Sequence, residues 1–296
     1  MLRSFLRNNL SNKNKQLLRQ GLRCYPLSTS RIRTLPDWLV IGAQKSGTTS
    51  LYFYLMQHPQ NCFALPDIKE PQFFNKHYNK GINYYRSHFP LRSLEFLRSL
   101  RLSQYQTREA TPEYLFHHFS PARAYQLVPN AKLIVVLRNP VERAYSHWNM
   151  IRTKGQRVET LSFEDAVDAE TERIQPEYEK MLADPINFSW SGPLEWFSYV
   201  ERGKYVDQIE NWLKYFPKDQ ILILKSEDFL AEPQKNYFRV TQFLGLKPYE
   251  KIDFGTTQVG TYKSKMPSGV REKLVETFKP YNERLQKYVD WSIDWD

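Results

Sequence analysis

Short apolar runs alternate with amphipathic stretches along most of this chain. Continuous apolar segments predict buried strands at residues 37–41, 132–137 and 220–224. Apolar residues at helical spacing, or amphipathic character, predict helices at residues 48–56, 92–102, 122–127, 140–154, 163–179, 205–216, 235–244 and 270–288. Strands that alternate with helices indicate a parallel sheet covered on both faces. We therefore predict an α/β fold, with one three-layer domain of the P-loop type and a central parallel β-sheet flanked by helices.

Size and composition support one large domain. The chain has 296 residues, of which 41% are hydrophobic and 15% aromatic, so a sizeable core is expected. No apolar run is long enough to predict a transmembrane helix. The two cysteines, Cys24 and Cys62, exclude a disulfide framework, and no Cys/His cluster has the spacing of a zinc site. These features favour a reducing, cytoplasmic location and predict no metal.

The positive charge is concentrated before the domain. Residues 1–36 contain eight basic side chains and no acidic one, so they contribute +8 to the net charge of +10 and the remainder contributes +2. We divide the chain into a basic N-terminal arm, residues 1–35, and a domain, residues 36–296. Three interpretations of the arm stay open: a solvated extension, a peripheral contact with acidic membrane lipid, and an organellar transit peptide.

A phosphate-binding loop is predicted between the first strand and the first helix. In Ile41-Gly42-Ala43-Gln44-Lys45-Ser46-Gly47-Thr48-Thr49, two glycines and the final hydroxyl hold the positions of a Walker A loop. Thr48 occupies the place of the Walker lysine, and the lysine lies inside the loop as Lys45. The motif therefore indicates phosphate binding with chemistry other than ATP hydrolysis.

A second anion-binding residue follows the strand at residues 132–137. Arg138-Asn139-Pro140 turns the chain into the next helix. Because ligands of parallel sheets bind at the carboxyl ends of the strands, we expect Arg138 to converge with the Lys45 loop. Arginine forms forked hydrogen bonds with phosphate oxygens. No acidic residue stands after this strand where a Walker B motif would place one.

Together these motifs resemble those of sulfotransferases that use 3′-phosphoadenosine 5′-phosphosulfate (PAPS). The resemblance is closest to the heparan sulfate N- and 3-O-sulfotransferase domains and their bacterial relatives, and it covers roughly residues 36–295. It rests on the loop at 41–49 and on Lys69-Glu70-Pro71-Gln72-Phe73-Phe74, Lys80-Gly81-Ile82-Asn83-Tyr84-Tyr85, Glu109-Ala110-Thr111-Pro112-Glu113-Tyr114, 137–146, Arg202-Gly203-Lys204-Tyr205 and Tyr281-Asn282-Glu283-Arg284-Leu285.

The resemblance implies an enzyme of class EC 2.8.2 that moves a sulfuryl group from PAPS to a hydroxyl or amine and releases adenosine 3′,5′-bisphosphate (PAP), without a metal. It implies Glu70 as the catalytic base and Lys45 as the residue that stabilises the leaving phosphate. The implied donor-binding residues are Lys45, Ser46, Gly47, Thr48, Thr49, Arg138, Ser146, Tyr262 and Lys263. The acceptor-binding candidates are Lys69, Glu70, Arg108 and Tyr205.

Several alternatives bear on these assignments. The segment with Tyr262 and Lys263 is equally well explained as an exposed basic loop. Ala110 stands where the heparan enzymes carry a lysine, so the role of that lysine is not carried over. The resemblance suggests a carbohydrate acceptor, such as a glycan, a glycolipid or a glycoside. A P-loop kinase is the main competing hypothesis and is disfavoured by Thr48. A nucleic-acid-binding protein is disfavoured because the basic charge lies in the arm, so no nucleic-acid partner is expected.

Overall fold

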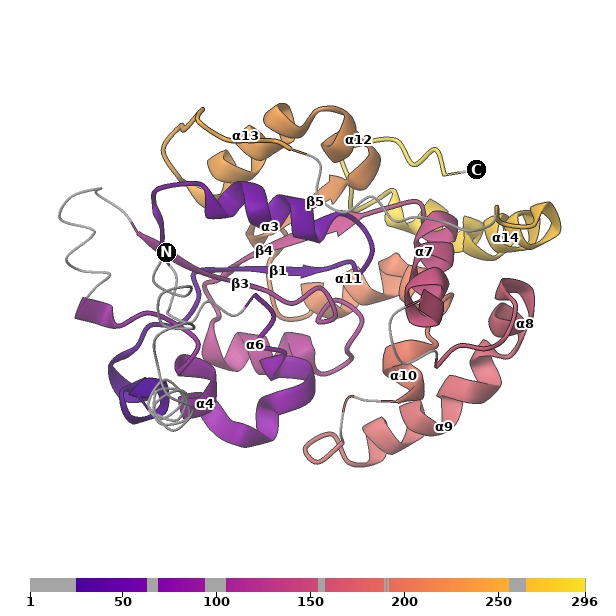
Figure 1. Cartoon of the computed structure of the whole chain (residues 1–296), viewed down its shortest axis with the longest axis horizontal. Coiled ribbons are helices and arrows are strands. Elements are labelled where there is room, and N and C mark those ends of the chain that lie inside the picture. Colours follow the sequence, from indigo (N-terminus) through magenta and orange to yellow (C-terminus); the bar gives the residue numbers. More distant parts are fainter. Residues whose placement is uncertain are drawn as a thin grey trace, which may run out of the picture.

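A five-stranded parallel sheet lies at the centre of the protein (Figure 1). The computed structural model describes residues 25–62, 69–93, 105–153, 158–188, 190, 192–255 and 265–295. The strands are β1 (Trp38–Gly42), β2 (Asn61–Cys62), β3 (Gln106–Ala110), β4 (Lys132–Leu137) and β5 (Ile221–Lys225), in the order β2-β3-β1-β4-β5. Every pairing in this order is parallel, which confirms the predicted α/β architecture.

Alternate side chains of the central strands enter two separate cores. Leu39 and Ile41 of β1 pack into one core, whereas Trp38 and Val40 pack into the other. One face is covered by α3 (Thr48–Met56), α12 (Ser226–Ala231) and α13 (Pro233–Leu244), and the other by α4 (Gly81–Arg86), α6 (Ser120–Leu127) and α11 (Tyr205–Leu213). The three layers explain why β1 and β4 have almost no polar residues.

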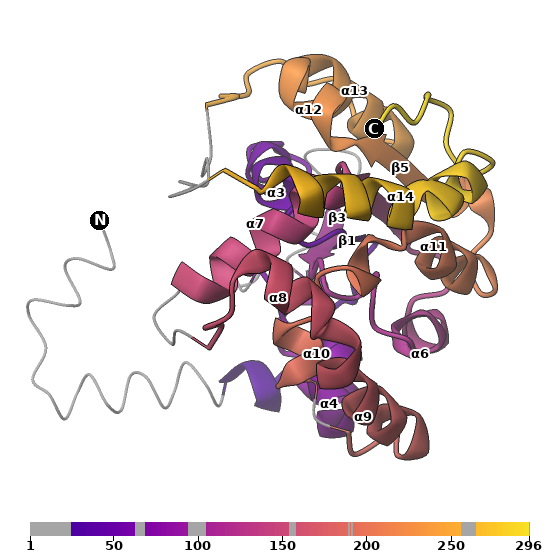
Figure 2. The ribbon, with the colours of Figure 1, turned by 90° about the vertical axis from the view of Figure 1, so that its right-hand side faces the viewer.

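A third core lies beyond the carboxyl ends of the strands (Figure 2). Its helices are α7 (Pro140–Thr153), α8 (Phe163–Asp168), α9 (Glu170–Ala183), α10 (Pro193–Trp196) and α14 (Ser268–Leu285). Trp190 and Tyr199 are buried there and contribute to this core. Short helical turns complete the described chain: η1 (Ser30–Ile32), η2 (Phe73–His77), η3 (Tyr78–Lys80), η4 (Glu201–Gly203) and η5 (Lys218–Gln220).

Most predicted elements agree with the structure, with two exceptions. The helix at 48–56 and the strand at 132–137 have the predicted bounds. The amphipathic stretch at 163–179 forms two helices, α8 and α9, which are separated at Ala169. Strand β3 was not predicted, because Arg108 and Glu109 interrupt its apolar pattern although both are buried. The helix predicted at 92–102 lies mostly outside the described residues.

The end of the N-terminal arm is in contact with the domain. Arg33 Nη1 donates to the carbonyl oxygen of Phe89 at 2.6 Å, and Thr34 N donates to that of Pro90 at 3.0 Å. Residues 1–24 lie outside the described residues, so the three interpretations of the arm remain predictions. Among the helices that the structure describes, none has the length and apolar character needed to cross a bilayer.

The connections of the sheet place a topological switch point beside β1 and β4. The chain leaves β1 through α3 on one face, whereas it leaves β4 toward α11 on the other face. The loops after these two neighbouring strands therefore diverge at their carboxyl ends. In open α/β sheets this switch point is where ligands bind.

The close approach of Gly42 and Leu115 gives a first prediction. A Cβ atom at position 42 would lie 2.4 Å from Leu115 Cβ. We expect Gly42→Ala to lower the free energy of unfolding by about 1–3 kcal/mol, because the loop after β1 must shift to remove this overlap. Thermal or urea denaturation measures the effect. Gly269→Ala is the matched control, since nothing lies within 4 Å of its added Cβ. Equal stability of Gly42→Ala and the wild type would contradict this account.

Candidate active site

The loop between β1 and α3 is shaped to receive an anion. Lys45 and Gly47 both have left-handed backbone angles, with φ of 72° and 87°. Glycine adopts this conformation at little cost, which explains its position directly before the helix. No side chain caps the start of α3. The first N–H groups of a helix have no intrahelical acceptor, so this turn offers donors and a positive dipole end to a ligand.

The hydroxyl of Ser46 is a further donor in this loop. Ser46 is fully buried, and its Oγ has no hydrogen-bond partner among the described residues. The Tyr205 hydroxyl lies beside Ser46 and donates to the carbonyl oxygen of Arg138 at 2.9 Å. Burial raises the pKa of Tyr205 to about 12, so this hydroxyl remains a donor at neutral pH. A buried hydroxyl without a partner is costly, and an oxygen of a bound phosphate or sulfonate would satisfy it.

Arg138 lies against the loop, as we expected from the strand ends. Its Nη1 is 3.4 Å from the carbonyl oxygen of Lys45. The next residue, Asn139, accepts hydrogen bonds from Val141 N at 2.9 Å and Glu142 N at 3.3 Å, and so caps α7. Ser146 is buried on the same helix. The structure thus brings a guanidinium group and the start of a second helix to the same end of the sheet as the loop.

A carboxylate stands beside the helix start. The Lys69 ammonium group donates both to Thr49 Oγ1 and to Glu70 Oε1, each at 3.0 Å. Thr49 belongs to the first turn of α3, so one ammonium group joins the anion-binding loop to Glu70. The Glu70 side chain is 37% exposed, which leaves it accessible to a second substrate. A carboxylate with this exposure can accept a proton from a ligand.

The segment that carries Glu70 is held by a buried tyrosine. Tyr114 Oη accepts hydrogen bonds from the backbone N–H groups of Phe73, at 2.7 Å, and Phe74, at 3.3 Å. The same hydroxyl donates to the carboxylate of Glu109. Glu109 also accepts from Thr111 Oγ1 at 2.9 Å and from the Tyr85 hydroxyl. A chain of hydrogen bonds therefore runs from the sheet, through Tyr114, to the backbone three residues after Glu70.

Burial dominates the acidity of Glu109. Its side chain is 2% exposed, and desolvation raises its pKa to about 7, although the hydrogen bonds from Tyr114, Tyr85 and Thr111 oppose this rise. This network explains how strand β3 accommodates a carboxyl group. Its partner in the strand, Arg108, packs with its guanidinium carbon 4.6 Å from the centre of the Tyr52 ring.

A second buried carboxylate supports the loop from the other side. Glu113 accepts hydrogen bonds from Gln44 at 3.3 Å, Asn75 at 3.0 Å and Trp190 Nε1 at 3.2 Å. Arg202 Nη1 donates to Gln44 Oε1 at 3.3 Å. Burial raises the pKa of Glu113, and the charge of Arg202 opposes the rise. The side chain of Gln44 is therefore held between the carboxylate of Glu113 and the guanidinium group of Arg202.

Several cationic side chains lie close to the loop. The pKa of buried His147 lies well below its usual value because of burial and because of the charges of Arg202, Arg143 and Lys45. Burial lowers the pKa of Arg143 to about 10, so it still carries a proton at neutral pH. With Arg138 against Lys45, these residues create the positive potential that a multiply charged anion requires.

Comparison with known proteins shows the family of this chain. Residues 35–279 match the family model described as the sulfotransferase domain. The chain belongs to the sulfotransferase family.

Relatives of the chain align over most of its length. This sulfotransferase is 32% identical to human heparan sulfate glucosamine 3-O-sulfotransferase 3B1, over 91% of this chain and 67% of that protein. It is 27% identical to the membrane-associated sulfotransferase kil1 of Dictyostelium discoideum, over 98% of this chain and 72% of that protein. The crystal structure of a sulfotransferase from Alicyclobacillus acidocaldarius has a TM-score of 0.64 and 27% identity, and covers 88% of this chain and 99% of the other.

The candidate residues occupy different positions around this site. Lys45, Thr49, Lys69, Glu70 and Arg138 come together as described above. Tyr205 is 1% exposed and lies beneath the loop, whereas Arg108 is 6% exposed and packs on Tyr52, so acceptor contact by either residue remains a prediction. Tyr262 and Lys263 lie outside the described residues. Among the residues that the structure describes, no group of three His, Cys, Asp or Glu side chains could hold a metal ion.

Sequence reasoning gave no role to Glu109, Tyr114, Glu113 or Gln44. The first three belong to a motif that supported the family resemblance, and Gln44 lies within the loop motif. The sequence signal was the presence of two acids, Glu109 and Glu113, within one short motif of the family resemblance.

The raised pKa of Glu109 gives a prediction for stability. The unfolded chain loses this proton near pH 4.5, whereas the folded protein keeps it until about pH 7. The contribution of Glu109 to the free energy of unfolding therefore falls between pH 4.5 and 7, by on the order of 3 kcal/mol, and is constant above that range. Glu109→Gln removes this titration. Its stability relative to the wild type should rise by that amount from pH 4.5 to 8.

Urea denaturation at several pH values measures this difference. The other buried carboxyl with a pKa raised to about 7, Glu170, is present in both proteins, so its effect cancels. Glu172→Gln, at an exposed position of α9, is the matched surface control. A difference between Glu109→Gln and the wild type that does not change with pH would refute the assignment.

Proposed function

We propose that this sulfotransferase moves a sulfuryl group from PAPS to a hydroxyl or amine of a carbohydrate acceptor. The observation that carries the proposal is the bridge that Lys69 makes between Thr49 of the anion-binding loop and Glu70. It places a carboxylate beside the loop that would bind the donor. The family match supports the type of reaction, and the names of the heparan sulfate relatives support the class of acceptor.

The two ends of the donor would be held by two parts of the site. The backbone N–H groups of the loop, the Ser46 hydroxyl and Lys45 suit the 5′-phosphosulfate. Arg138 and Ser146, after β4, suit the 3′-phosphate. Tyr262 and Lys263 are proposed to cover the nucleotide.

The reaction then assigns separate roles to Glu70 and Lys45. Glu70 accepts the proton of the attacking hydroxyl or amine, while the oxygen or nitrogen of that group forms a bond to the sulfur. The bond between the sulfur and the bridging oxygen of the 5′-phosphate breaks, and its electron pair stays on the phosphate of PAP. Lys45 stabilises the negative charge that develops on that oxygen. All atoms and charges are accounted for without a metal.

Cellular location is part of the same proposal. We place the enzyme in the cytoplasm, with the basic arm as a peripheral contact to acidic lipid, and an organellar targeting role of the arm is the alternative. The description of kil1 as membrane-associated supports the contact. The eight basic residues of the arm supply the required charge.

Donor choice distinguishes this proposal from a kinase. We expect PAP to bind in the presence of EDTA, and ATP with Mg²⁺ to bind much more weakly, because Thr48 replaces the Walker lysine. Isothermal titration calorimetry measures both affinities. Arg138→Ala should weaken PAP binding by about one to two orders of magnitude, through loss of a charged hydrogen bond. Exposed Arg31→Ala is the control. Tight binding of ATP that depends on Mg²⁺, without binding of PAP, would favour the kinase.

Replacing Glu70 and Lys45 separates proton transfer from leaving-group stabilisation. Glu70→Gln should lower kcat by about 10²–10⁴ with unchanged PAP affinity, because the amide cannot accept the proton. Lys45→Ala should lower kcat by about 10²–10³. Labelled PAPS and a carbohydrate panel, read by mass spectrometry, measure transfer. The controls are Glu164→Gln and Lys180→Ala, both exposed. Full activity of Glu70→Gln would remove Glu70 from the base role.

A further inference from the structure

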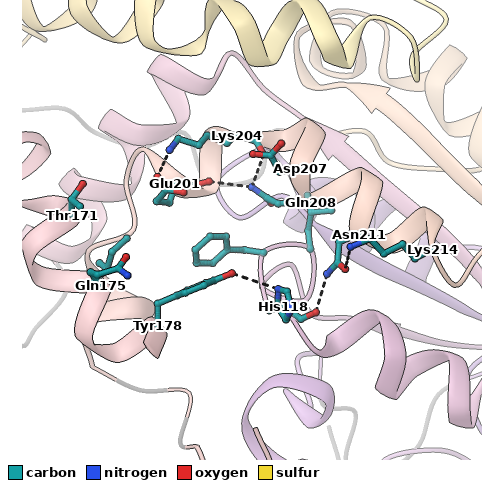
Figure 3. Close-up of a pocket in the computed structure, with 13 residues that line it drawn as sticks. His118, Thr171, Gln175, Tyr178, Glu201, Lys204, Asp207, Gln208, Asn211 and Lys214 are labelled. Atoms are coloured by element: carbon teal, nitrogen blue, oxygen red, sulfur yellow. Dashed lines mark hydrogen bonds and ion pairs between the residues drawn. The ribbon is translucent and has the colours of Figure 1, made fainter. Parts of the chain in front are cut away.

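A second cavity lies apart from the loop, Arg138 and Glu70. It has a volume of about 440 Å³ and is bounded by α9 on one side and by η4 and α11 on the other (Figure 3). This volume is within the range of small-ligand pockets. Thr171, Gln175 and Tyr178 come from α9, and Lys204, Gln208 and Asn211 come from the segment that begins α11.

The residues of each wall have helical spacing. Positions 171, 175 and 178 lie on one face of α9, and positions 204, 208 and 211 lie on one face at the start of α11. Most side chains on these faces are polar or amphipathic, and Ile174 of α9 adds one apolar group to the lining. The two faces line the same cavity, so they border a space instead of packing against each other. If α9 and α11 faced each other only to stabilise the fold, apolar faces of the two helices would be in contact here.

The lining combines aromatic rings with fixed hydrogen-bonding groups. Phe116 and Tyr178 contribute the rings, and the Tyr178 hydroxyl points toward His118. Asn211 Nδ2 donates to the carbonyl oxygen of His118 at 2.8 Å, and Gln208 Nε2 donates to backbone carbonyls at 3.1–3.3 Å. These bonds fix the amide planes. Rings beside oriented amides suit a ligand with apolar faces and many hydroxyl groups.

The charges around the cavity cancel. Lys204 and Lys214 are balanced by Glu201 and Asp207. Lys204 forms an ion pair with Glu201. Arg284, outside the lining, pairs with Asp207 at 2.8 Å and with Glu210 at 2.6 Å, so the charges still sum to zero when these two neighbours are included. Burial and the charge of Lys214 lower the pKa of His118 and so disfavour a positive charge on its ring. A polyanion would find no net attraction here, in contrast to the cation-rich site at the loop.

Two side chains, Phe116 and Arg202, link the cavity to the donor loop. Phe116 lines the cavity, and the guanidinium carbon of Arg202 lies 4.9 Å from the centre of its ring. Arg202 in turn donates to Gln44 of the loop. A ligand in the cavity would therefore lie near the reaction centre without entering it.

We propose that this cavity binds a neutral sugar unit and is a second carbohydrate site of the protein. The site requires neither a donor nucleotide nor sulfuryl transfer, so it goes beyond the proposed function. Tyr178 and Phe116 contact the faces of the sugar ring, and Gln175, Gln208 and Asn211 bind its hydroxyl groups. A glycan or a glycolipid headgroup with such a unit would be held beside the active site.

Binding measurements on the full chain without nucleotide test this site. The probes are cellobiose, maltose and lactose, with a heparin-derived sulfated disaccharide as the anionic comparison, followed by saturation-transfer NMR and calorimetry. We expect at least one neutral disaccharide to bind and the sulfated one to bind more weakly. Tyr178→Ala should weaken binding by about tenfold, as expected for the loss of one ring contact. Thr171→Trp, at an exposed position, should block the cavity without removing a core contact.

Two controls separate this site from the reaction centre. Leu182→Ala changes an exposed residue of α9 that does not line the cavity, and should leave sugar binding unchanged. Lys45→Ala should also leave it unchanged, because the loop lies behind Arg202. The proposal is overturned if no neutral disaccharide binds, if the sulfated one binds more tightly, or if Lys45→Ala abolishes binding that Tyr178→Ala and Thr171→Trp preserve. None of these results depends on whether the protein transfers sulfate.

Discussion

The active site depends on one buried carboxyl group, that of Glu109. It fixes the Tyr114 hydroxyl, and this hydroxyl holds the backbone N–H groups of Phe73 and Phe74. Since Glu70 lies only a few residues earlier in the same segment, its position relative to the loop follows from this chain of contacts. The cost of burying Glu109, evident in its raised pKa, is offset by three hydroxyl donors. If one of these hydrogen bonds were lost, the buried polar groups would make the fold less stable than apolar side chains in their place would. The members of the network therefore depend on one another.

Buried contacts also fix the position of the donor loop. Gly42 permits contact with Leu115, and Gln44 is fixed between Glu113 and Arg202. Both contacts are made by residues that follow β3, the strand beside β1. The sheet thus sets the distance between the loop and the Glu70 segment through two buried acids on one neighbouring stretch of chain. Such preorganisation lets the site meet developing charge without rearranging.

The local sequence pattern predicted the helices and strands that are rich in apolar residues. The other elements depend on contacts between residues that are far apart in the chain. The helix at 48–56 and the strand at 132–137 were predictable because they are rich in apolar residues, and the meeting of Arg138 with the loop followed from parallel topology. Strand β3 was not predictable, because the charges of Arg108 and Glu109 are compensated by Tyr52, Tyr85 and Tyr114 from other segments. The division of residues 163–179 into two helices was also beyond the sequence pattern, since both parts share an amphipathic face. The cavity between α9 and α11 could not be inferred, because two polar helical faces ordinarily indicate solvent.

The electrostatic contrast between the two sites suggests how they would work together. The cations around the loop favour a multiply charged donor, but they contribute nothing to the affinity for a neutral acceptor. Binding energy from parts of a substrate away from the reacting group can be used to orient that group. A charge-balanced cavity that is linked to the loop through Phe116 and Arg202 would supply such energy without competing for the donor. A second binding site of this kind therefore contributes to the recognition and orientation of the acceptor.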